Sequence, residues 1–246
     1  MMFFKRTFET PARSHQFPLA PNEGINLDLK VMYVAVPKTG STSIRSLFRA
    51  KGPFLFDTPH LSINQLRQVL HFWALSQAVG RCREFPTDPD AVLSDLEVYE
   101  KAESIFSSCL KLGSVRNPFA RAISLYFRAE GIQMRTKIGF DQFVDQLAFA
   151  SDTCVHPARM RNQLDWFLDR KGGELLVDRI LKLENLGNDL AQLSTDFPHL
   201  GRISNTHKRV NPNSESSNYR EFYTNSSRKS VEKVFSKDLE FFSYTF

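Results

Sequence analysis

A segment rich in hydroxyl groups, PKTGSTS at residues 37–43, directly follows a short apolar run near the start of the chain. Gly40 lets the backbone approach an anion closely, and Lys38 adds a positive charge. A turn that leads from a strand into a helix points its backbone N–H groups outward, and this arrangement binds anions. The segment therefore predicts an anion site, whose members are Lys38, Thr39, Gly40, Ser41, Thr42 and Ser43.

The nearest general pattern is the nucleoside-triphosphate loop, G-x-x-x-x-G-K-[ST]. The first glycine of that pattern is missing here, and Lys38 precedes Gly40 instead of following it. A conventional ATP or GTP loop is therefore disfavoured. A serine-rich first helical turn that only caps a helix is the simpler alternative, but capping does not require Lys-Thr-Gly-Ser-Thr directly after a strand.

A second motif, SVRNPFARAISLY, spans Ser114 to Tyr126. Arg116 stands at the exit of an expected strand, and its planar guanidinium suits a phosphate group. Ser124 follows about two helical turns later, where its side chain can still face a ligand held at the helix start. Alone, Arg116 would be interpreted as a surface ion pair and Ser124 as a serine bonded to its own helix backbone. Together with the first motif, the interpretation as an anion site is favoured.

Strands and helices are expected to alternate along the chain. Apolar runs predict buried strands at 30–36, at 107–116 and within 174–186. Helices are expected at 41–51, 62–79, 91–102, 117–130 (with Asn117 as N-cap and Pro118 first), 140–150, 159–171 and 185–196, and one more near the C-terminus. This order predicts an α/β fold of three layers, a central, mainly parallel sheet flanked by helices. Both motifs then lie at the carboxyl ends of strands, where such sheets bind ligands.

The composition is that of an ordinary globular protein, with 41% hydrophobic and 24% charged residues among 246. We expect an irregular arm over residues 1–28 and a single domain over 29–246, with the 22 phenylalanines in the core. No apolar run predicts a transmembrane segment or a signal peptide, and three scattered cysteines fit a reducing compartment, so a cytoplasmic location is expected. The net charge of +5 suits an anionic ligand, but no basic run with interleaved aromatic residues indicates nucleic-acid binding.

The two motifs, about seventy residues apart, resemble the sulfotransferases that use 3′-phosphoadenosine-5′-phosphosulfate (PAPS). The variant with PKTGSTS and VRNPFARAISLY is similar to the carbohydrate sulfotransferases, the branch that includes the heparan 2-O and chondroitin enzymes. The downstream segments follow in that branch's usual order, so the resemblance covers roughly residues 30–246. These segments are HPARMRNQLDWFLDRKG, LLVDRILKLENL, HKRVNPNS and KDLEFFSYTF. LVDRILKLENL departs from the family pattern, which more often has a hydrophobic residue followed by Gly-Arg, and this leaves the role of Glu184 open.

The resemblance implies a P-loop-like fold and transfer of a sulfuryl group from PAPS to a carbohydrate hydroxyl, without a metal. The first loop would bind the 5′-phosphosulfate, with Lys38 stabilising charge on the leaving side, and Arg116 and Ser124 would bind the 3′-phosphate. Arg209 and Ser214 would close over the nucleotide, although a plain polar surface loop explains them equally well. Arg159, Arg161 and Lys208 would suit an anionic carbohydrate acceptor, or are ordinary surface charges.

The acceptor hydroxyl needs a base, and an ordinary histidine, with a pKa of about 6.5, can serve near neutral pH. His60, in DTPHLS, is the best candidate, because the family often has a loop histidine at this point. An ordinary loop histidine is the alternative interpretation of His60, and His156 and His207 are other candidates for the base. His71, beside Phe72 and Trp73 in an expected helix, is interpreted as structural.

Two other functions stay open at this point. A nucleotide kinase-like phosphotransferase is disfavoured by the position of Lys38 and by the lack of a clear magnesium-binding aspartate at a second strand end. A non-catalytic relative that binds a nucleotide or a glycan is disfavoured by the intact Lys38, Arg116 and Ser124. The acceptor, the sulfated position and the oligomeric state are not determined by the sequence, and a membrane-associated Golgi location is the alternative if an anchor is supplied elsewhere.

Overall fold

A computed structural model of the chain describes residues 19–79, 95–127, 138–146, 162–171, 173–201, 203 and 216–246. Four strands form its central sheet in the order β2–β3–β5–β6: β2 (Ile25–Asn26), β3 (Val31–Val34), β5 (Leu110–Val115) and β6 (Arg179–Lys182). Strands β3, β5 and β6 run parallel, whereas β2 is antiparallel to β3. The mainly parallel sheet expected from the sequence is confirmed.

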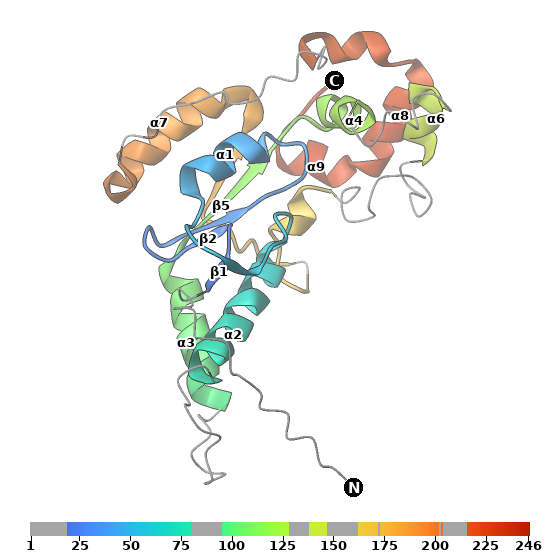
Figure 1. Ribbon diagram of the computed structural model, residues 1–246. Coiled ribbons are helices and arrows are strands. Elements are labelled where there is room, and N and C mark those ends of the chain that lie inside the picture. The colour runs from blue at the N-terminus through green and yellow to red at the C-terminus, as the bar shows by residue number, and fades with distance from the viewer. Residues whose placement is uncertain are drawn as a thin grey trace, which may run out of the picture.

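Helices cover both faces of this sheet (Figure 1). On one face lie α1 (Ser41–Phe48) and α7 (Leu186–Asp196), and on the other α2 (Ile63–Val79) and α3 (Asp95–Ser108). Successive side chains of a strand point to opposite faces. Val31 and Tyr33 accordingly pack in the cluster of α1 and α7, while Met32 and Val34 pack in the cluster of α2 and α3. The expected three layers are confirmed.

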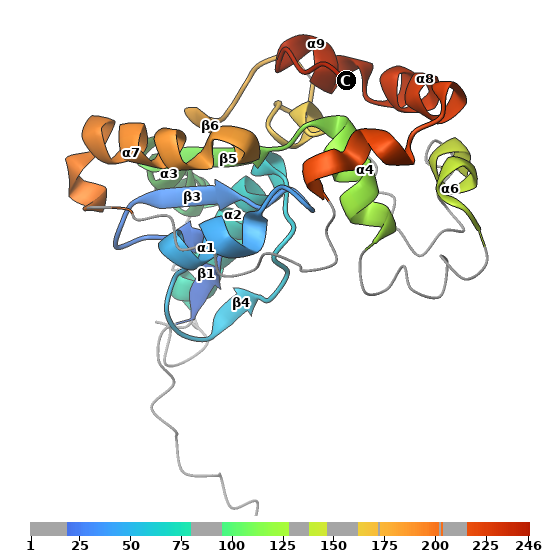
Figure 2. The same cartoon turned by 90° about the horizontal axis from the view of Figure 1, so that it is seen from above.

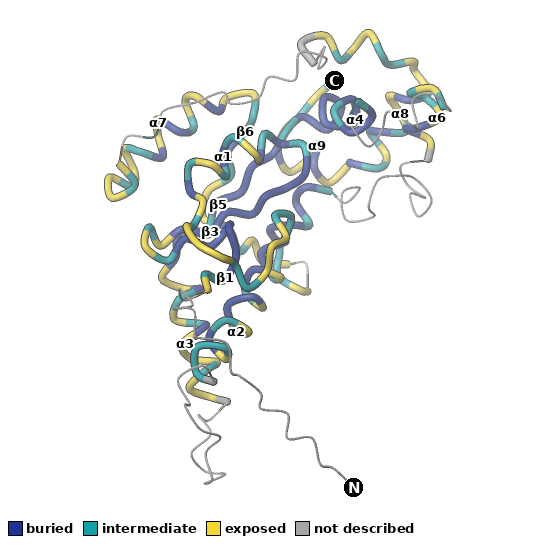
Figure 3. Tube along the Cα trace, in the orientation of Figure 1, coloured by how far each residue is buried: buried dark blue, intermediate teal, exposed yellow. Residues whose placement is uncertain are grey.

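A second group of helices lies beyond the carboxyl ends of the strands: α4 (Pro118–Tyr126), α6 (Phe140–Gln146), α8 (Asn225–Val234) and α9 (Ser236–Phe241). Figure 2 shows α4, α6 and α8 side by side there, at a distance from α7. A buried cluster joins α4, α6 and α8, and its phenylalanines include Phe119, Phe143 and Phe235. Figure 3 traces dark buried backbone through the central strands and through α4. Phenylalanines thus pack in a core, as the composition suggested, and this core is a second one apart from the two faces of the sheet.

Capping interactions explain where two of the helices begin. The Asn117 side chain accepts a hydrogen bond from Phe119 N at 2.9 Å, and Pro118 occupies the first helical position of α4. At the start of α2, Ser62 N donates to Gln65 Oε1 at 2.8 Å and Gln65 N donates to Ser62 Oγ, which is a capping box. The N-cap expected at Asn117 is confirmed.

The prediction of a helix at 159–171 is wrong for residues 162–171. These residues contain a single 3₁₀ turn, η5 (Leu164–Trp166), instead of an α-helix. Long-range partners replace the helical hydrogen bonds here. The N–H groups of Gln163 and Leu164 donate to the side chain of Asp238, and Leu176 N donates to Phe167 O at 2.8 Å. The segment thus folds back in an antiparallel bridge between Leu168 and Leu175.

Both ends of the described chain are more regular than expected. From Ala20 onward the expected irregular arm contains β1 (Ala20–Asn22), paired in parallel with β4 (Phe54–Phe56), and β2, paired with the main sheet. Near the C-terminus there are two helices, α8 and α9, instead of one, because the chain breaks at the buried Phe235. Besides η5, the described residues contain the 3₁₀ elements η6 (Leu183–Asn185), η7 (Pro198–Leu200) and η8 (Ser216–Phe222). Division of the chain into an arm and one domain stays a prediction.

Candidate functional site

The parallel pairing of β3, β5 and β6 brings three chain exits to one edge of the sheet. Val34 pairs with Gly113, and Val115 pairs with Lys182. The chain therefore leaves the sheet at the same carboxyl edge in three places: at the turn 37–40, after Val115 and at the 3₁₀ turn η6. This is the edge at which open α/β sheets bind ligands.

The turn between β3 and α1 has the geometry of an anion cradle. Lys38 and Gly40 both have left-handed backbone conformations, with φ of 68° and 76°. Gly40 is the N-cap of α1, and the N–H groups of Gly40, Ser41 and Thr42 make no hydrogen bond to a described residue. Unsatisfied N–H groups at a helix start carry partial positive charge, which favours an anion. Thr42 is exposed, while Ser43 is partly and Ser41 almost fully buried.

The hydroxyl of Thr39 does not share in this cradle. Thr39 is buried, and its Oγ1 donates to Val36 O at 2.9 Å and lies 2.7 Å from Ser114 Oγ. Ser114 Oγ in turn lies 2.6 Å from the hydroxyl of Tyr33, whose pKa is raised by burial. Because Thr39 donates to a carbonyl, Ser114 donates to Thr39 and Tyr33 to Ser114. This ordered chain of hydroxyls fastens the turn to β3 and β5, so Thr39 can offer a ligand only its backbone.

The second motif places Arg116 and Ser124 as the sequence predicted, at the exit of β5 and within α4. The guanidinium of Arg116 makes no hydrogen bond or ion pair with any described residue. Burial lowers the pKa of Arg116, and the facing Glu184 and Tyr244 oppose that shift. Ser124 is partly exposed, and its hydroxyl has no hydrogen-bond partner in the described parts of the chain. The bond from Ser124 to its own helix, the simpler alternative, is therefore not found.

A buried arginine that the sequence reasoning missed links the two motifs. Arg121 on α4 is 1% exposed, and its Nε donates to Pro37 O at 3.0 Å. Burial lowers its pKa to about 10, with Asp238 opposing the shift and Arg116 adding to it. The helix that carries Ser124 thereby holds the turn that carries Lys38. The only signal in the sequence was a charged residue among the apolar positions of this helix.

Glu184, whose role the sequence left open, holds the start of α4. Its Oε1 accepts a hydrogen bond from Asn117 N at 2.6 Å, and its Oε2 accepts one from the hydroxyl of Tyr244 at 2.9 Å. Asn117 Nδ2 donates to Thr245 O at 2.9 Å. The end of β6, the start of α4 and the last residues of the chain are therefore joined beside Arg116.

His60 lies between β4 and α2 and is oriented by the end of β3. Its Nδ1 lies 2.7 Å from Ala35 O. A carbonyl oxygen only accepts, so Nδ1 carries the hydrogen, and Nε2 carries the lone pair in the neutral ring. The capping box that begins at Ser62 fixes the chain just after His60. His71, by contrast, lies between α2 and α3, where it bonds to Glu103 at 2.8 Å, in keeping with a structural role.

Seven residues named by the sequence analysis lie outside the described residues: His156, Arg159, Arg161, His207, Lys208, Arg209 and Ser214. Among the described residues, no histidine, cysteine and carboxylate side chains gather as in a metal site. Within the same ranges, no helix has the length and apolar character needed to span a membrane. The absence of a metal from the reaction and the roles of the seven residues stay predictions.

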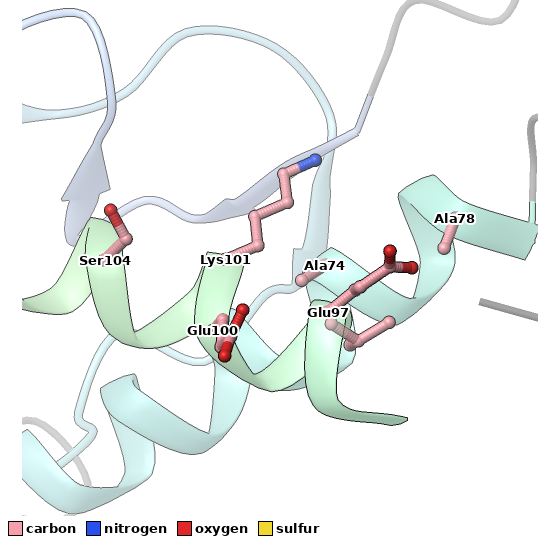
Figure 4. A pocket seen from close by; sticks show the side chains of 7 residues that line it. Ala74, Ala78, Glu97, Glu100, Lys101 and Ser104 are labelled. Atoms are coloured by element: carbon pink, nitrogen blue, oxygen red, sulfur yellow. The ribbon is translucent and has the colours of Figure 1, made fainter. Parts of the chain in front are cut away.

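A hollow between α2 and α3 lies away from this site. Figure 4 shows Ala74, Glu97, Lys101 and Ser104 along its walls. Ala74 lies about 16 Å along α2 from Ile63, the end of that helix nearest His60. The hollow therefore has no part in the candidate site.

The comparison with protein families agrees with the geometry. A family model described as the sulfotransferase family matches residues 25–245. No curated protein and no solved structure matches the chain. The matched range takes in the central sheet, the turn at Lys38, the exit of β5 at Arg116 and the C-terminal helices. On this match and this arrangement of strands and anion-binding groups, the chain belongs to the sulfotransferase family.

Proposed function

We propose that the protein transfers the sulfuryl group of PAPS to a hydroxyl group of a carbohydrate. One observation carries the proposal: two anion-binding groups follow neighbouring parallel strands at the same edge of the sheet. The first is the anion cradle of the 37–43 turn. The second is the guanidinium of Arg116, which has no hydrogen-bond partner among the described residues. PAPS carries a phosphosulfate on one side of its ribose and a phosphate on the other. Two separate anion-binding groups suit this donor better than a nucleotide with a single phosphate chain.

The donor roles follow from what each group offers. The N–H groups of Gly40, Ser41 and Thr42 would hold the 5′-phosphate, and Lys38 would stabilise the charge that develops on the leaving oxygen. Arg116 and Ser124 would hold the 3′-phosphate, because both have hydrogen-bonding capacity that no described residue uses. The site would thus bind the nucleotide at two points and leave the sulfuryl group open to the acceptor.

The transfer would be an in-line displacement. An acceptor oxygen forms a bond to sulfur while the bond between sulfur and the oxygen of the 5′-phosphate breaks, and adenosine 3′,5′-bisphosphate leaves. The proton of the acceptor hydroxyl goes to Nε2 of His60, the ring nitrogen that carries the lone pair. The carbonyl of Ala35 supports this step, because it orients the ring and accepts a hydrogen bond from Nδ1.

Titration calorimetry with adenosine 3′,5′-bisphosphate tests the donor site, with 5′-AMP and ATP–Mg²⁺ as controls. We expect selective binding of the bisphosphate near 1 μM, which corresponds to about −8 kcal/mol. A preference for ATP–Mg²⁺ would favour the kinase-like alternative, and absence of nucleotide binding would contradict a PAPS-dependent reaction.

The carbohydrate acceptor is supported by the motif variant PKTGSTS with VRNPFARAISLY, which resembles the carbohydrate branch. Transfer of radiolabelled sulfate from PAPS to a panel of polysaccharides, oligosaccharides and small hydroxylated metabolites tests it. Labelling of a saccharide is the expected result. Labelling confined to non-carbohydrate hydroxyl compounds would contradict the acceptor class, and bisphosphate binding without transfer to any compound would favour the non-catalytic alternative.

A further inference from the structure

A buried glutamine contacts the backbone of Arg116 on both sides. Gln163 is 0% exposed and lies far from Arg116 in the sequence. The N–H of Arg116 donates to Gln163 Oε1 at 2.9 Å, and Gln163 Nε2 donates to Arg116 O at 2.8 Å. A neighbouring strand would make the same two bonds. Since β5 ends at Val115, this side chain continues the sheet by one residue and fixes the peptide planes on either side of Arg116.

Asp238, at the start of α9, fixes the orientation of that glutamine. Its Oδ2 accepts hydrogen bonds from Gln163 N at 2.8 Å and from Gln163 Nε2 at 3.1 Å, and its Oδ1 accepts one from Leu164 N at 2.9 Å. Both hydrogens of Nε2 are therefore used, one on Arg116 O and one on Asp238. A flipped amide would point its oxygen at a carbonyl and a carboxylate, so only one orientation is compatible with these neighbours.

The side chain of Arg116 has no comparable anchor of its own. The neighbouring Arg121 is held through the bond from its Nε to Pro37 O, whereas the guanidinium of Arg116 has no hydrogen bond to the described residues. A long side chain loses conformational freedom when it binds a ligand, and a fixed backbone reduces that loss. The position of the Arg116 guanidinium relative to a bound ligand therefore depends on the backbone contacts that Gln163 makes.

We propose that Gln163 is a positioning residue for Arg116, oriented by Asp238, and that this pair sets the affinity for the 3′-phosphate of the donor. The proposal rests on the proposed function, in which Arg116 binds that phosphate. It makes a selective claim: loss of the pair weakens binding of nucleotides that carry a 3′-phosphate and leaves contacts to the 5′ side unchanged.

Gln163→Met tests the proposal, because methionine has a similar length and forms neither bond. Affinities are measured by calorimetry for adenosine 3′,5′-bisphosphate and for adenosine 5′-phosphosulfate, which lacks the 3′-phosphate. We expect about a tenfold loss for the bisphosphate and less than a twofold loss for the phosphosulfate. Gln192→Met is the matched control, since Gln192 on α7 also bonds an aspartate, Asp196, but on the surface.

Asp238→Asn serves as a second variant, because it keeps the size of the side chain, and thermal melts establish that each variant is folded. We expect the same selective loss in Asp238→Asn, since its amide cannot accept all three N–H bonds. Equal losses for both nucleotides, or no loss in folded Gln163→Met or Asp238→Asn, overturn the proposal while leaving the donor site intact. If the wild-type protein does not bind the bisphosphate, the proposed function and this inference fail together.

Discussion

Lys38 combines a strained backbone with a positively charged side chain in the turn that forms the anion cradle. Its φ of 68° costs a non-glycine residue about 1 kcal/mol, and such strain persists where the surrounding structure holds it. We expect Lys38→Ala to lower turnover about a hundredfold but the affinity for adenosine 3′,5′-bisphosphate less than tenfold, because the charge develops in the transition state. Steady-state kinetics with PAPS and calorimetry measure the two effects.

Lys30 supplies the matched control for this prediction. It also has a left-handed backbone, with φ of 50°, but it is exposed and precedes β3, at the opposite edge of the sheet. Lys30→Ala should leave turnover within twofold of wild type. Unchanged turnover in Lys38→Ala would remove Lys38 from the mechanism.

Arg116 allows a test of the proposed division of the donor site into two parts. Arg116→Ala should weaken binding of adenosine 3′,5′-bisphosphate about a hundredfold and that of adenosine 5′-phosphosulfate less than threefold, because only the former has a 3′-phosphate. Competition calorimetry measures both affinities. Arg179→Ala, which removes an exposed arginine paired with Asp196 at 3.6 Å, is the control and should change neither. Equal losses for the two nucleotides in Arg116→Ala would show that Arg116 is structural.

At the scale of single residues, the sequence predicted the positions that follow strands and missed those held by distant partners. Lys38 and Arg116 were named because they follow the ends of expected strands, and Ser124 because it lies in the helix after the second strand, and the structure places all three there. Their binding roles stay predictions. The inward hydroxyl of Thr39 depends on Ser114, 75 residues away, and no local pattern reveals such a contact. Gln163 was missed for the same reason.

At the scale of elements, Gly40 lets α1 begin close to η6. A Cβ at Gly40 would lie 2.6 Å from Leu183 Cδ1, and φ there is 76°. Gly52 also has a positive φ, of 104°, but a Cβ would meet nothing within 4 Å. We therefore expect Gly40→Ala to lower the free energy of unfolding by about 1 kcal/mol more than Gly52→Ala. Urea unfolding measures both changes.

A double-mutant cycle separates this contact from backbone strain. In a Leu183→Ala background the methyl of Gly40→Ala has room, so the excess over Gly52→Ala should disappear. An excess of unchanged size in that background would mean that the cost comes from the conformation of Gly40 alone.

The packing of α2 against α3 includes a carboxylate that should respond to pH. Glu103 is hydrogen-bonded by Arg67 and His71, and the bond from Arg67 is the main cause that lowers its pKa below the ordinary value of 4.5. A lowered pKa means that the stabilisation is complete above pH 4.5 and is lost as the pH falls through the lower, folded-state value. We expect the free energy of unfolding of wild type to fall more steeply below pH 4.5 than that of Glu103→Gln.

Urea unfolding at a series of pH values between 6 and about 3 measures this slope. Glu100→Gln is the matched control, because Glu100 lies on the same helix, is exposed and makes no ion pair with a described residue. Its slope should match that of wild type. Parallel slopes for wild type and Glu103→Gln would contradict the prediction.

Most helices and strands with a regular spacing of apolar residues could be predicted from the sequence. The predictions failed where side chains distant in the sequence bind the backbone N–H groups of a segment. The helices α1, α2 and α7 follow their expected ranges closely, since one apolar face of each packs on the sheet. The segment 162–171 has helix-forming residues, but Asp238 takes up N–H groups of this segment and the bridge to Leu175 reverses its direction. Such a choice depends on contacts across the whole fold, which local propensity does not report.

At the scale of the whole molecule, the last residues of the chain join the second helical cluster to the sheet. Tyr244 bonds Glu184 beside β6, and Thr245 O accepts from Asn117 at the start of α4. The ring of Phe246 lies 4.9 Å from that of Phe119 and 5.4 Å from that of Tyr223. The C-terminal segment therefore supports the helix that carries Ser124.

Phe246→Ala tests how far the molecule depends on this closure. Phe246 is partly buried, so we expect the free energy of unfolding to fall by about 2 kcal/mol, with a matching drop in thermal midpoint of about 4–8 °C. Phe241→Ala is the control: Phe241 is 51% exposed, and its loss should cost less than about 0.5 kcal/mol. Equal effects of the two variants would contradict the prediction. They would mean that the aromatic contacts of Phe246 add no measurable stability and that the other contacts of α4, including its packing against α6 and α8, hold the helix without them.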